Sequence, residues 1–278
     1  MTRHIRRCCG VTLLASSFFL GAVARGEPAP TTRPALDPLL QKRTRKSIDR
    51  GLAFLKSRQN REGGWTDEFG PAVTAIVAKA FAQDPTYGPR HPIVRRAVAN
   101  ILRYEQTDGG IYERRQNLAN YQTSIVLMFL STLHDPAHAG RIAKAQAFLT
   151  RLQFDAGESI DTDNPWYGGA GYNQTKRPDL SNTQLMLEAL HQSGLAPDDP
   201  VYKRALKFVS RCQLNEATND LPLARGFTDG GFIYSTNAGG ESKASEKLQE
   251  GRAPLRSYGS MTYAGFKSML YAGLTRDD

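Results

Sequence analysis

The stretch that decides the fold is residues 50–65, Arg50-Gly51-Leu52-Ala53-Phe54-Leu55-Lys56-Ser57-Arg58-Gln59-Asn60-Arg61-Glu62-Gly63-Gly64-Trp65. Its apolar residues Leu52 and Leu55 share one helical face, and a glutamine and a short turn then lead to Gly-Gly-Trp. The glutamine returns as Gln106 and Gln153, 47 residues apart each time, and as Gln213 after a longer unit. Periods of this size are typical of arrays of helical hairpins. The sequence therefore predicts an all-α repeat fold with about four hairpins.

Each unit is expected to hold two helices joined by a glycine turn. The second helices are apolar around most of their circumference, so we expect them to form an inner layer behind the more amphipathic first helices. A threonine recurs near the start of these second helices, where its hydroxyl is suited to cap backbone donors. The recurring threonines and glycine pairs are Thr74, Thr123, Thr183 and Thr262, and 63–64, 109–110, 168–169 and 230–231.

The third and fourth units carry insertions at 154–167, 214–229 and 237–257. Insertions collected at one end of a helical array usually mark its functional rim. Units three and four also end alike, at 194–199 and 273–278, with Gly-Leu followed by Asp-Asp. We therefore expect a fifth unit to follow, and the chain to be a fragment that forms an incomplete barrel.

The N-terminus has the pattern of an export signal. Three arginines precede a short apolar stretch at 11–24, and a proline-rich segment follows. The expected organisation is a signal peptide at 1–26, a proline-rich linker at 27–40 and helical repeats at 41–278. The mature protein would be periplasmic or extracellular, without a transmembrane segment. Cleavage would leave 32 basic and 27 acidic residues, a net charge of +5, and no motif for nucleic acid.

The repeat at residues 50–65 resembles the QW repeat of squalene–hopene and oxidosqualene cyclases. The shared features are a basic residue, Gly or Ala, an aromatic and an aliphatic residue, Gln, and then Gly-x-Trp. The resemblance extends over about residues 44–274 and implies an α/α toroid of inner and outer helices, as in the wider superfamily that includes protein prenyltransferase β subunits. It also implies that Gln59 and Trp65, and by extension Gln106, Gln153 and Gln213, join neighbouring outer helices.

The residues that the chemistry of those families requires are not evident in this sequence. The cyclases protonate an alkene with an Asp-x-Asp-Asp acid, and the nearest candidates, Asp161 and Asp163, lie in an inserted loop where water would keep them ionised. Zinc-dependent prenyl transfer needs Asp, Cys and His ligands, but no histidine is suitably spaced from Cys212. We therefore expect no catalytic residue, no metal and no cofactor.

Aromatic residues gather around the glycine turns, where they either staple each turn to its neighbour or line a ligand cavity. Stapling is the simpler interpretation for most of them, because they recur with the unit. The residues that we consider as candidates for a ligand cavity are Trp166, Tyr167, Tyr172, Asn182, Tyr121 and Tyr258.

Three functions remain open on the sequence. The first is an exported binding or scaffold toroid without catalysis, whose ligand would be an isoprenoid or other hydrophobic molecule, a carbohydrate or a protein partner. The second is an isoprenoid cyclase or prenyltransferase-like enzyme whose catalytic residues lie in missing repeats. The third is a toroid of the polysaccharide lyase kind, which rests on analogy of fold alone.

Overall fold

The computed structural model describes residues 37–66, 68–175, 177–244 and 255–275. The chain divides into two compact units, Met1–Arg45 and Lys46–Asp278, and the second contains all the helices after α1 (Pro38–Arg58). The signal peptide predicted at 1–26 and most of the linker predicted at 27–40 lie outside the described residues. They stay predictions, as does the fifth unit. Helix α1 begins at Pro38, within the last residues assigned to the linker.

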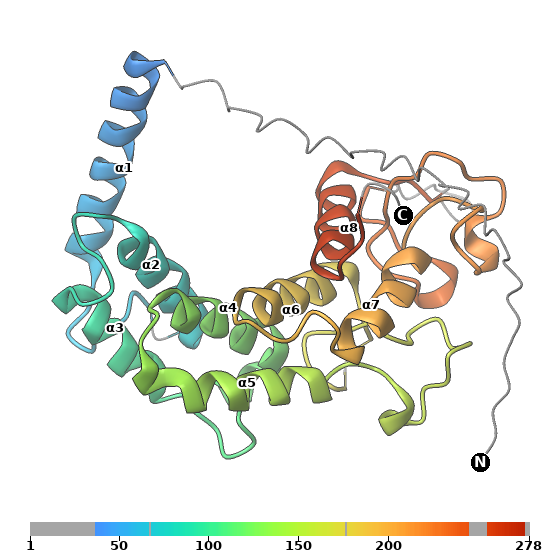
Figure 1. Ribbon diagram of the computed structural model, residues 1–278, viewed down its shortest axis with the longest axis horizontal. Helices are drawn as coiled ribbons and strands as arrows, with labels where there is room; N and C mark the ends of the chain where they lie inside the picture. The colour runs from blue at the N-terminus through green and yellow to red at the C-terminus, as the bar shows by residue number, and fades with distance from the viewer. Residues whose placement is uncertain (1–36, 67, 176, 245–254, 276–278) are drawn as a thin grey trace, which may run out of the picture. The chain divides into compact units, whose positions relative to one another are not determined.

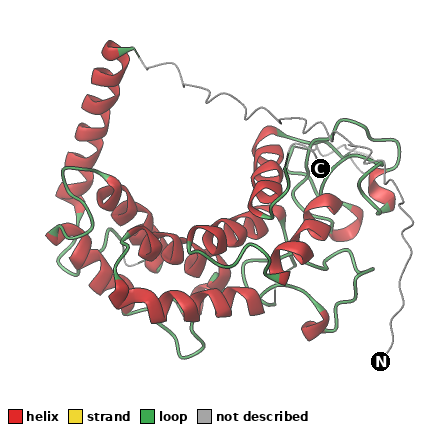
Figure 2. Cartoon of the chain, viewed as in Figure 1, coloured by secondary structure: helices red, strands yellow, loops and turns green. Residues whose placement is uncertain are grey.

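The described residues form eight α-helices and no β-strand (Figures 1 and 2). Within the second unit, α2 packs against α4, α4 against α6, and α6 against α8, while α3, α5 and α7 form a second layer beside this row. The predicted all-α fold of inner and outer helices, of the α/α-toroid class, is thereby confirmed. The bounds of the remaining helices are α2 Pro71–Gln83, α3 Pro92–Leu102, α4 Ala119–Thr132, α5 Ala139–Arg151, α6 Leu180–Gln192, α7 Pro200–Arg211 and α8 Gly259–Tyr271.

The two layers differ in burial as the sequence pattern predicts. In α4 every residue from Gln122 to Leu130 is buried, because neighbouring helices cover this inner helix on all sides. In the outer helix α3 the buried side chains Val94, Ala97 and Ile101 follow a helical spacing along one face. The outer helices therefore bury one stripe, whereas the middle of the inner row is covered all round.

Each repeated threonine stabilises the glycine turn before it. The Oγ1 of Thr183 accepts a hydrogen bond of 2.9 Å from the backbone N–H of Ala170, which follows the glycine pair. Thr74, Thr123 and Thr262 accept the equivalent bonds from residues 65, 111 and 232. The hydroxyl thus satisfies a donor of the turn rather than one of its own helix. Because all four units make this bond, a threonine recurs at the same position of each inner helix.

The repeated glutamines hold their own turn and, in two units, the next outer helix. Gln59 donates from Nε2 to the carbonyl oxygens of Gly63 and Ile93, both at 2.9 Å. Gln153 donates in the same way to Gly168, at 2.9 Å, and to Val201, at 3.0 Å. Gln106 and Gln213 bond only within their own turns. The glutamine therefore joins units one to two and three to four.

The first glycine of the turn is required by both conformation and space. Gly168 has φ +85°, and a Cβ there would lie 1.8 Å from the carbonyl oxygen of Arg204 at the next outer helix. A Cβ on Gly63 would likewise come too close to the carbonyl oxygen of Arg96. Only a residue without a side chain allows this close approach between successive units.

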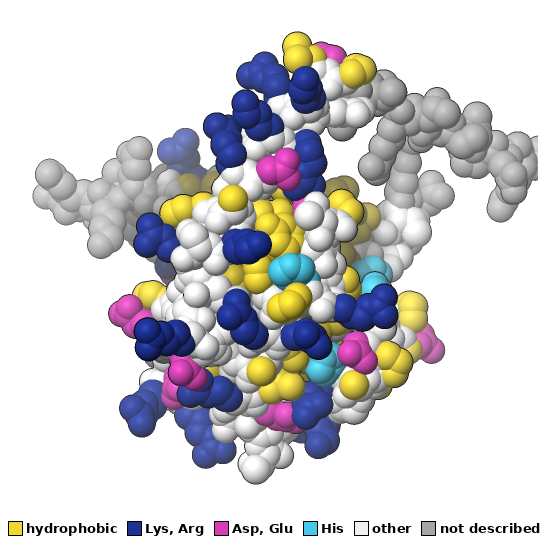
Figure 3. All heavy atoms as spheres, turned by 90° about the vertical axis from the view of Figure 1, so that its left-hand side faces the viewer, with side chains coloured by type: hydrophobic (Ala, Val, Ile, Leu, Met, Phe, Trp, Pro, Cys, Tyr) yellow, Lys and Arg dark blue, Asp and Glu magenta, His cyan; other side chains and the backbone are white. Residues whose placement is uncertain are grey.

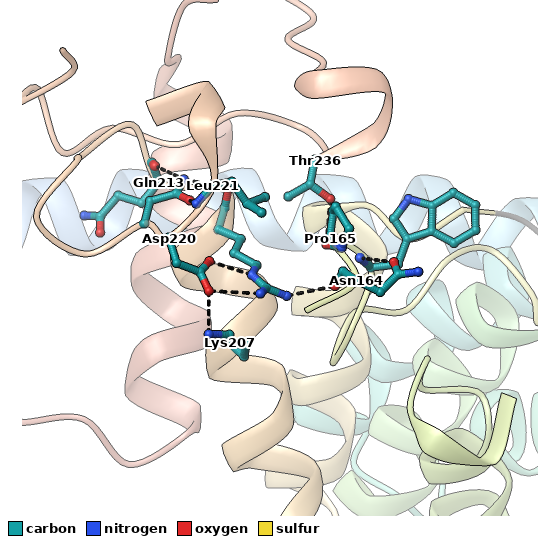
Figure 4. A network of polar contacts seen from close by, with 10 residues as sticks. Asn164, Pro165, Lys207, Gln213, Asp220, Leu221 and Thr236 are labelled. Atoms are coloured by element: carbon teal, nitrogen blue, oxygen red, sulfur yellow. Dashed lines mark hydrogen bonds and ion pairs between the residues drawn. The ribbon is translucent and has the colours of Figure 1, made fainter. Parts of the chain in front are cut away.

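A buried ion pair fixes the insertions of units three and four. The guanidinium of Arg211 donates from Nε and Nη2 to the two carboxylate oxygens of Asp220, at 2.7 and 2.9 Å, and from Nη1 to the carbonyl oxygen of Asn164, at 2.8 Å. Figure 4 shows this network, in which Lys207 also reaches Asp220 and Thr236 bonds to Pro165. The two insertions and the segment after Tyr234 are thus held to one another.

Candidate functional site

Four tyrosines gather where the inner helices begin. Tyr121 lies in the first turn of α4, Tyr172 precedes α6, Tyr234 follows the last glycine pair, and Tyr258 is the N-cap residue of α8. The rings of Tyr121 and Tyr172 are 6.4 Å apart, and the hydroxyl of Tyr234 hydrogen-bonds with those of Tyr172 and Ser181. We call Tyr121, Tyr172, Tyr234 and Tyr258 the tyrosine cluster.

The buried carboxylate of Asp179 lies beside the tyrosine cluster, at the start of α6. Asp179 is fully buried and caps α6, and its Oδ1 accepts bonds from the backbone of Asn182 at 2.9 Å and from Ser181 at 2.7 Å. Its Oδ2 accepts from Nδ2 of Asn182 at 2.8 Å. Asn182 itself is 1% exposed, so it positions the helix start and does not reach the surface where a ligand would lie.

Two cations flank the ring of Tyr234. The guanidinium of Arg177 lies 5.7 Å and the ammonium of Lys243 lies 4.6 Å from the centre of the ring. Both cations also form ion pairs with Glu241, which fixes their positions. This part of the site therefore presents phenol hydroxyls beside two cations that share one carboxylate.

The environment raises the pKa of two of these phenols, Tyr234 and Tyr258. Burial raises the pKa of Tyr234, and the nearby charge of Asp179 raises it further. Burial is also the largest cause of the raised pKa of Tyr258. A tyrosine that acts as a base needs a lowered pKa, because its anion must be populated near neutral pH. Tyr234 and Tyr258 are therefore suited to donate and accept hydrogen bonds, and unsuited to abstract a proton.

Two cavities adjoin the tyrosine cluster through residues 173–175. One, of about 280 Å³, is lined by Asn173, Gln174 and Thr175 together with the first turn of α4. The other, of about 500 Å³, shares Gln174 with it. Both also share Asp108 and Phe148. We call the tyrosine cluster and these two cavities together the rim site.

An aromatic pair lies beside these cavities. The ring of Phe148, which lines both, stacks on Tyr112 at 5.6 Å, and the hydroxyl of Tyr112 donates to Asp108 at 2.6 Å. Burial raises the pKa of Tyr112 to about 12, and this hydrogen bond to Asp108 adds to the rise. Arg114, Arg151 and Arg204 complete the polar wall. The rim site therefore combines flat apolar surfaces with many hydrogen-bonding groups.

The candidate cavity residues separate into two groups. The rings of Tyr121 and Tyr172 lie together. The charge of Asp179 raises the pKa of both Tyr258 and Tyr234, so these two also lie near one another. Trp166 instead packs edge-on against Phe154, with ring centres 5.7 Å apart, within the insertion. Tyr167 is half-buried in the same insertion, where its backbone N–H donates to Asn164. The aromatic side chain of Trp166 thus staples a turn.

The candidate acids and the cysteine lie apart from this surface. Asp161 and Asp163 are exposed in the insertion, where water reaches both carboxylates. Cys212 is fully buried at the end of α7, and burial raises the pKa of its thiol. Among the described residues no group of three His, Cys, Asp or Glu side chains is arranged to hold a metal ion. No described helix has the length and apolar character needed to cross a bilayer.

Several residues of the rim site escaped the sequence analysis. Tyr234, Arg177 and Lys243 were not expected there, nor were Gln174 and the Tyr112–Phe148 pair. A signal for Tyr234 does exist, because it stands four residues after Gly230, as Tyr172 stands four residues after Gly168. Phe148 lies on the buried face of α5, and the others come from loops whose course no periodic pattern describes.

Comparisons with known proteins add a likeness of fold. No family model matches the chain, and no curated protein matches it. Among solved structures, one matching chain is titled a polysaccharide lyase, with 13% sequence identity and a TM-score of 0.48. The match covers 86% of this chain and 67% of the other. At 13% identity and a TM-score of 0.48, this likeness carries no argument about family, ligand or reaction.

Proposed function

We propose that this chain is an exported binding protein that holds an oligosaccharide at the rim site and does not convert it. The repeats would supply a scaffold of the squalene-cyclase-like kind, and the loops before α4 and α6, together with the end of α5, would supply most of the recognition surface. The observation that carries the proposal is the combination of amide side chains, arginines and the stacked Tyr112–Phe148 pair around two open cavities, close to the tyrosine cluster. Sugar rings present both apolar faces and hydroxyls, which such a surface complements.

The protonation states favour binding over turnover. The raised pKa values of Tyr234 and Tyr258 oppose the proton abstraction that a lyase requires. Asp161 and Asp163 are exposed to water and line neither cavity of the rim site, so neither is placed to protonate a ligand there.

A second candidate function is binding or conversion of an isoprenoid, with catalytic residues supplied by further repeats. The observation in its favour is the exposed apolar surface on two inner helices. Val73 and Ile76 of α2 are 36% and 52% exposed, and Tyr263, Phe266 and Leu270 of α8 are between 50% and 65% exposed. The rim cavities suit such a ligand less well, because charged and amide groups line them and apolar ligands favour enclosed apolar pockets.

Isothermal titration calorimetry of the purified chain tests the proposal. The probes are neutral cello- and xylo-hexaose, acidic oligogalacturonate, and farnesyl diphosphate for the second candidate. We expect saturable binding of an oligosaccharide, and Tyr172→Phe should weaken it about three- to tenfold through the loss of one hydrogen bond. Tyr263→Phe is the matched control, because its ring lies on α8 away from the rim site and is 65% exposed.

The products of the incubation distinguish binding from catalysis. We expect the oligosaccharide to be recovered intact, without the ultraviolet absorbance of an unsaturated uronide. Release of such a product would favour the lyase alternative. Binding of farnesyl diphosphate alone would refute the oligosaccharide proposal and favour the second candidate.

A further inference from the structure

A third cavity, separate from the two of the rim site, lies where α4 ends and α5 begins. It has a volume of about 530 Å³ and opens between this connection and the start of α3. Its polar wall consists of Arg90, Arg95, His134, Asp135 and His138. None of these residues belongs to the rim site, which lies at the other end of the inner helices.

The two arginines are available to a ligand. Arg90 and Arg95 are exposed, and neither side chain forms a hydrogen bond or ion pair with another described residue. Asp135 is the single acid in the wall, and its Oδ1 already accepts a bond of 2.9 Å from the backbone N–H of Ala137. The cavity is therefore positively charged, with guanidinium groups whose donors face water. Such groups recognise the oxygens of an anion.

His138 provides a separate sign of a missing partner. The side chain is 9% exposed and lines the cavity, yet its Nδ1 is buried without a hydrogen-bond partner among the described residues. A buried polar atom without a partner is unfavourable, so native proteins rarely keep one. A ligand in the cavity would give this ring a polar neighbour.

The helix that starts here favours the same ligand charge. His138 is the N-cap residue of α5, a helix of 13 residues, and its side chain makes no capping bond. The start of a helix carries partial positive charge and backbone donors, which attract anions. The helix start, the two arginines and the buried imidazole therefore converge on one cavity.

The surrounding part of the chain is basic as well. Residues 37–151 contain 18 Lys and Arg against 10 Asp and Glu, whereas residues 152–278 contain 13 against 16. Lys and Arg side chains predominate over acidic ones on the face that Figure 3 shows. An anion would thus be attracted to this half of the protein before it reaches the cavity.

We infer that this cavity binds a small molecule through a tetrahedral oxyanion, either free phosphate or sulfate or the same group on a sugar. Arg90 and Arg95 hold the oxygens from the α3 side, and His138, the N-cap residue of α5, lies in the wall on the other side. The volume leaves room for a sugar ring beyond the anionic group.

Calorimetric titration of the full chain with sodium phosphate, against sodium chloride at equal ionic strength, tests the inference. We expect saturable binding of phosphate and no response to chloride. The variants Arg90→Gln and Arg95→Gln should each weaken phosphate binding about tenfold or more, since each removes a charge-assisted contact. Both side chains are exposed, so the variants should fold normally.

Arg61→Gln is the matched control, because it removes the same charge from an exposed arginine outside the cavity. Glucose 6-phosphate and glucose form a second pair of probes. Tighter binding of the phosphorylated sugar than of phosphate identifies an esterified ligand, and equal binding identifies the free anion. The inference is overturned if phosphate does not bind saturably, or if Arg61→Gln weakens binding as much as the cavity variants.

Discussion

The ion pair between Arg211 and Asp220 allows a prediction in which the exposed partner matters more than the buried one. The Arg211 side chain is 2% exposed, whereas Asp220 is 45% exposed and also pairs with Lys207, itself 43% exposed. Asp220→Asn leaves a buried guanidinium without its counter-charge. Breaking a buried pair in this way costs about 3 to 5 kcal/mol, and we expect about 3 because water reaches the Asp220 side.

Substitution of Arg211 or of Lys207 should lower the free energy of unfolding by less than Asp220→Asn does. Arg211→Met keeps most of the side-chain volume and removes the buried charge, while Asp220 stays hydrated and paired with Lys207. We expect a loss of about 2 kcal/mol from the missing charge-assisted bonds. Lys207→Met breaks a pair exposed at both ends and should cost less than about 1 kcal/mol. Lys203→Met, an exposed lysine on the same helix, is the matched control.

Urea unfolding at pH 7, followed by circular dichroism, measures these differences. The expected order of destabilisation is Asp220→Asn, then Arg211→Met, then Lys207→Met, with Lys203→Met close to the parent protein. A Lys207→Met variant as unstable as Asp220→Asn would refute the reasoning. So would an Arg211→Met variant less stable than Asp220→Asn.

The same pair predicts a dependence on pH. Hydrogen bonds from Arg211 are the largest cause that lowers the pKa of the Asp220 carboxyl from its usual value of 3.8. Since the folded-state pKa is lowered, the contribution to stability is complete above the unfolded-state pKa and is lost as the pH falls below about 4. Asp220→Asn should therefore show a shallower loss of stability than the parent protein on acidification below this pH.

Three further predictions concern the repeat scaffold. Gly168→Ala should lower the free energy of unfolding by about 3 kcal/mol or more, because a Cβ there would lie 1.8 Å from the carbonyl oxygen of Arg204. Gly226 has open space around it, so Gly226→Ala should lower the free energy of unfolding by only about 1 to 2 kcal/mol, through its positive φ. Gln153→Leu, which leaves two carbonyl groups without their donor, should cost more in urea unfolding than Gln213→Leu, which leaves one. Cys212 should not react with a thiol reagent at pH 8 until the protein unfolds, since it is fully buried and burial raises its pKa; rapid labelling of the folded protein would contradict this.

The repeat architecture was predictable because it depends on short-range patterns. The helical spacing around Leu52, the glutamine period and the recurring threonine each follow from local geometry. The partners of those residues were less accessible. The hydroxyl of Thr183 was expected to cap its own helix, yet it accepts a bond from the turn residue Ala170. That bond depends on how the turn folds back, which no periodicity describes.

The candidate sites were only partly predictable, for a related reason. Tyr121 and Tyr172 were singled out because they stand beside a glycine turn, and the structure places their rings together. Asp220 and Arg211 are nine residues apart and meet only because an insertion turns back on the end of α7. His134 and His138 meet Arg90 and Arg95 around one cavity, and no spacing in the sequence indicates that these segments come together.

Amide hydrogen–deuterium exchange, with and without the oligosaccharide that binds most tightly, tests the central claim most directly. The account predicts slower exchange on binding in residues 172–175 and 112–119, which border the rim site. The apolar faces of α2 and α8 should be unaffected. Protection confined to α2 and α8, or no protection in the rim site at saturation, would contradict the claim that the rim site is the binding surface.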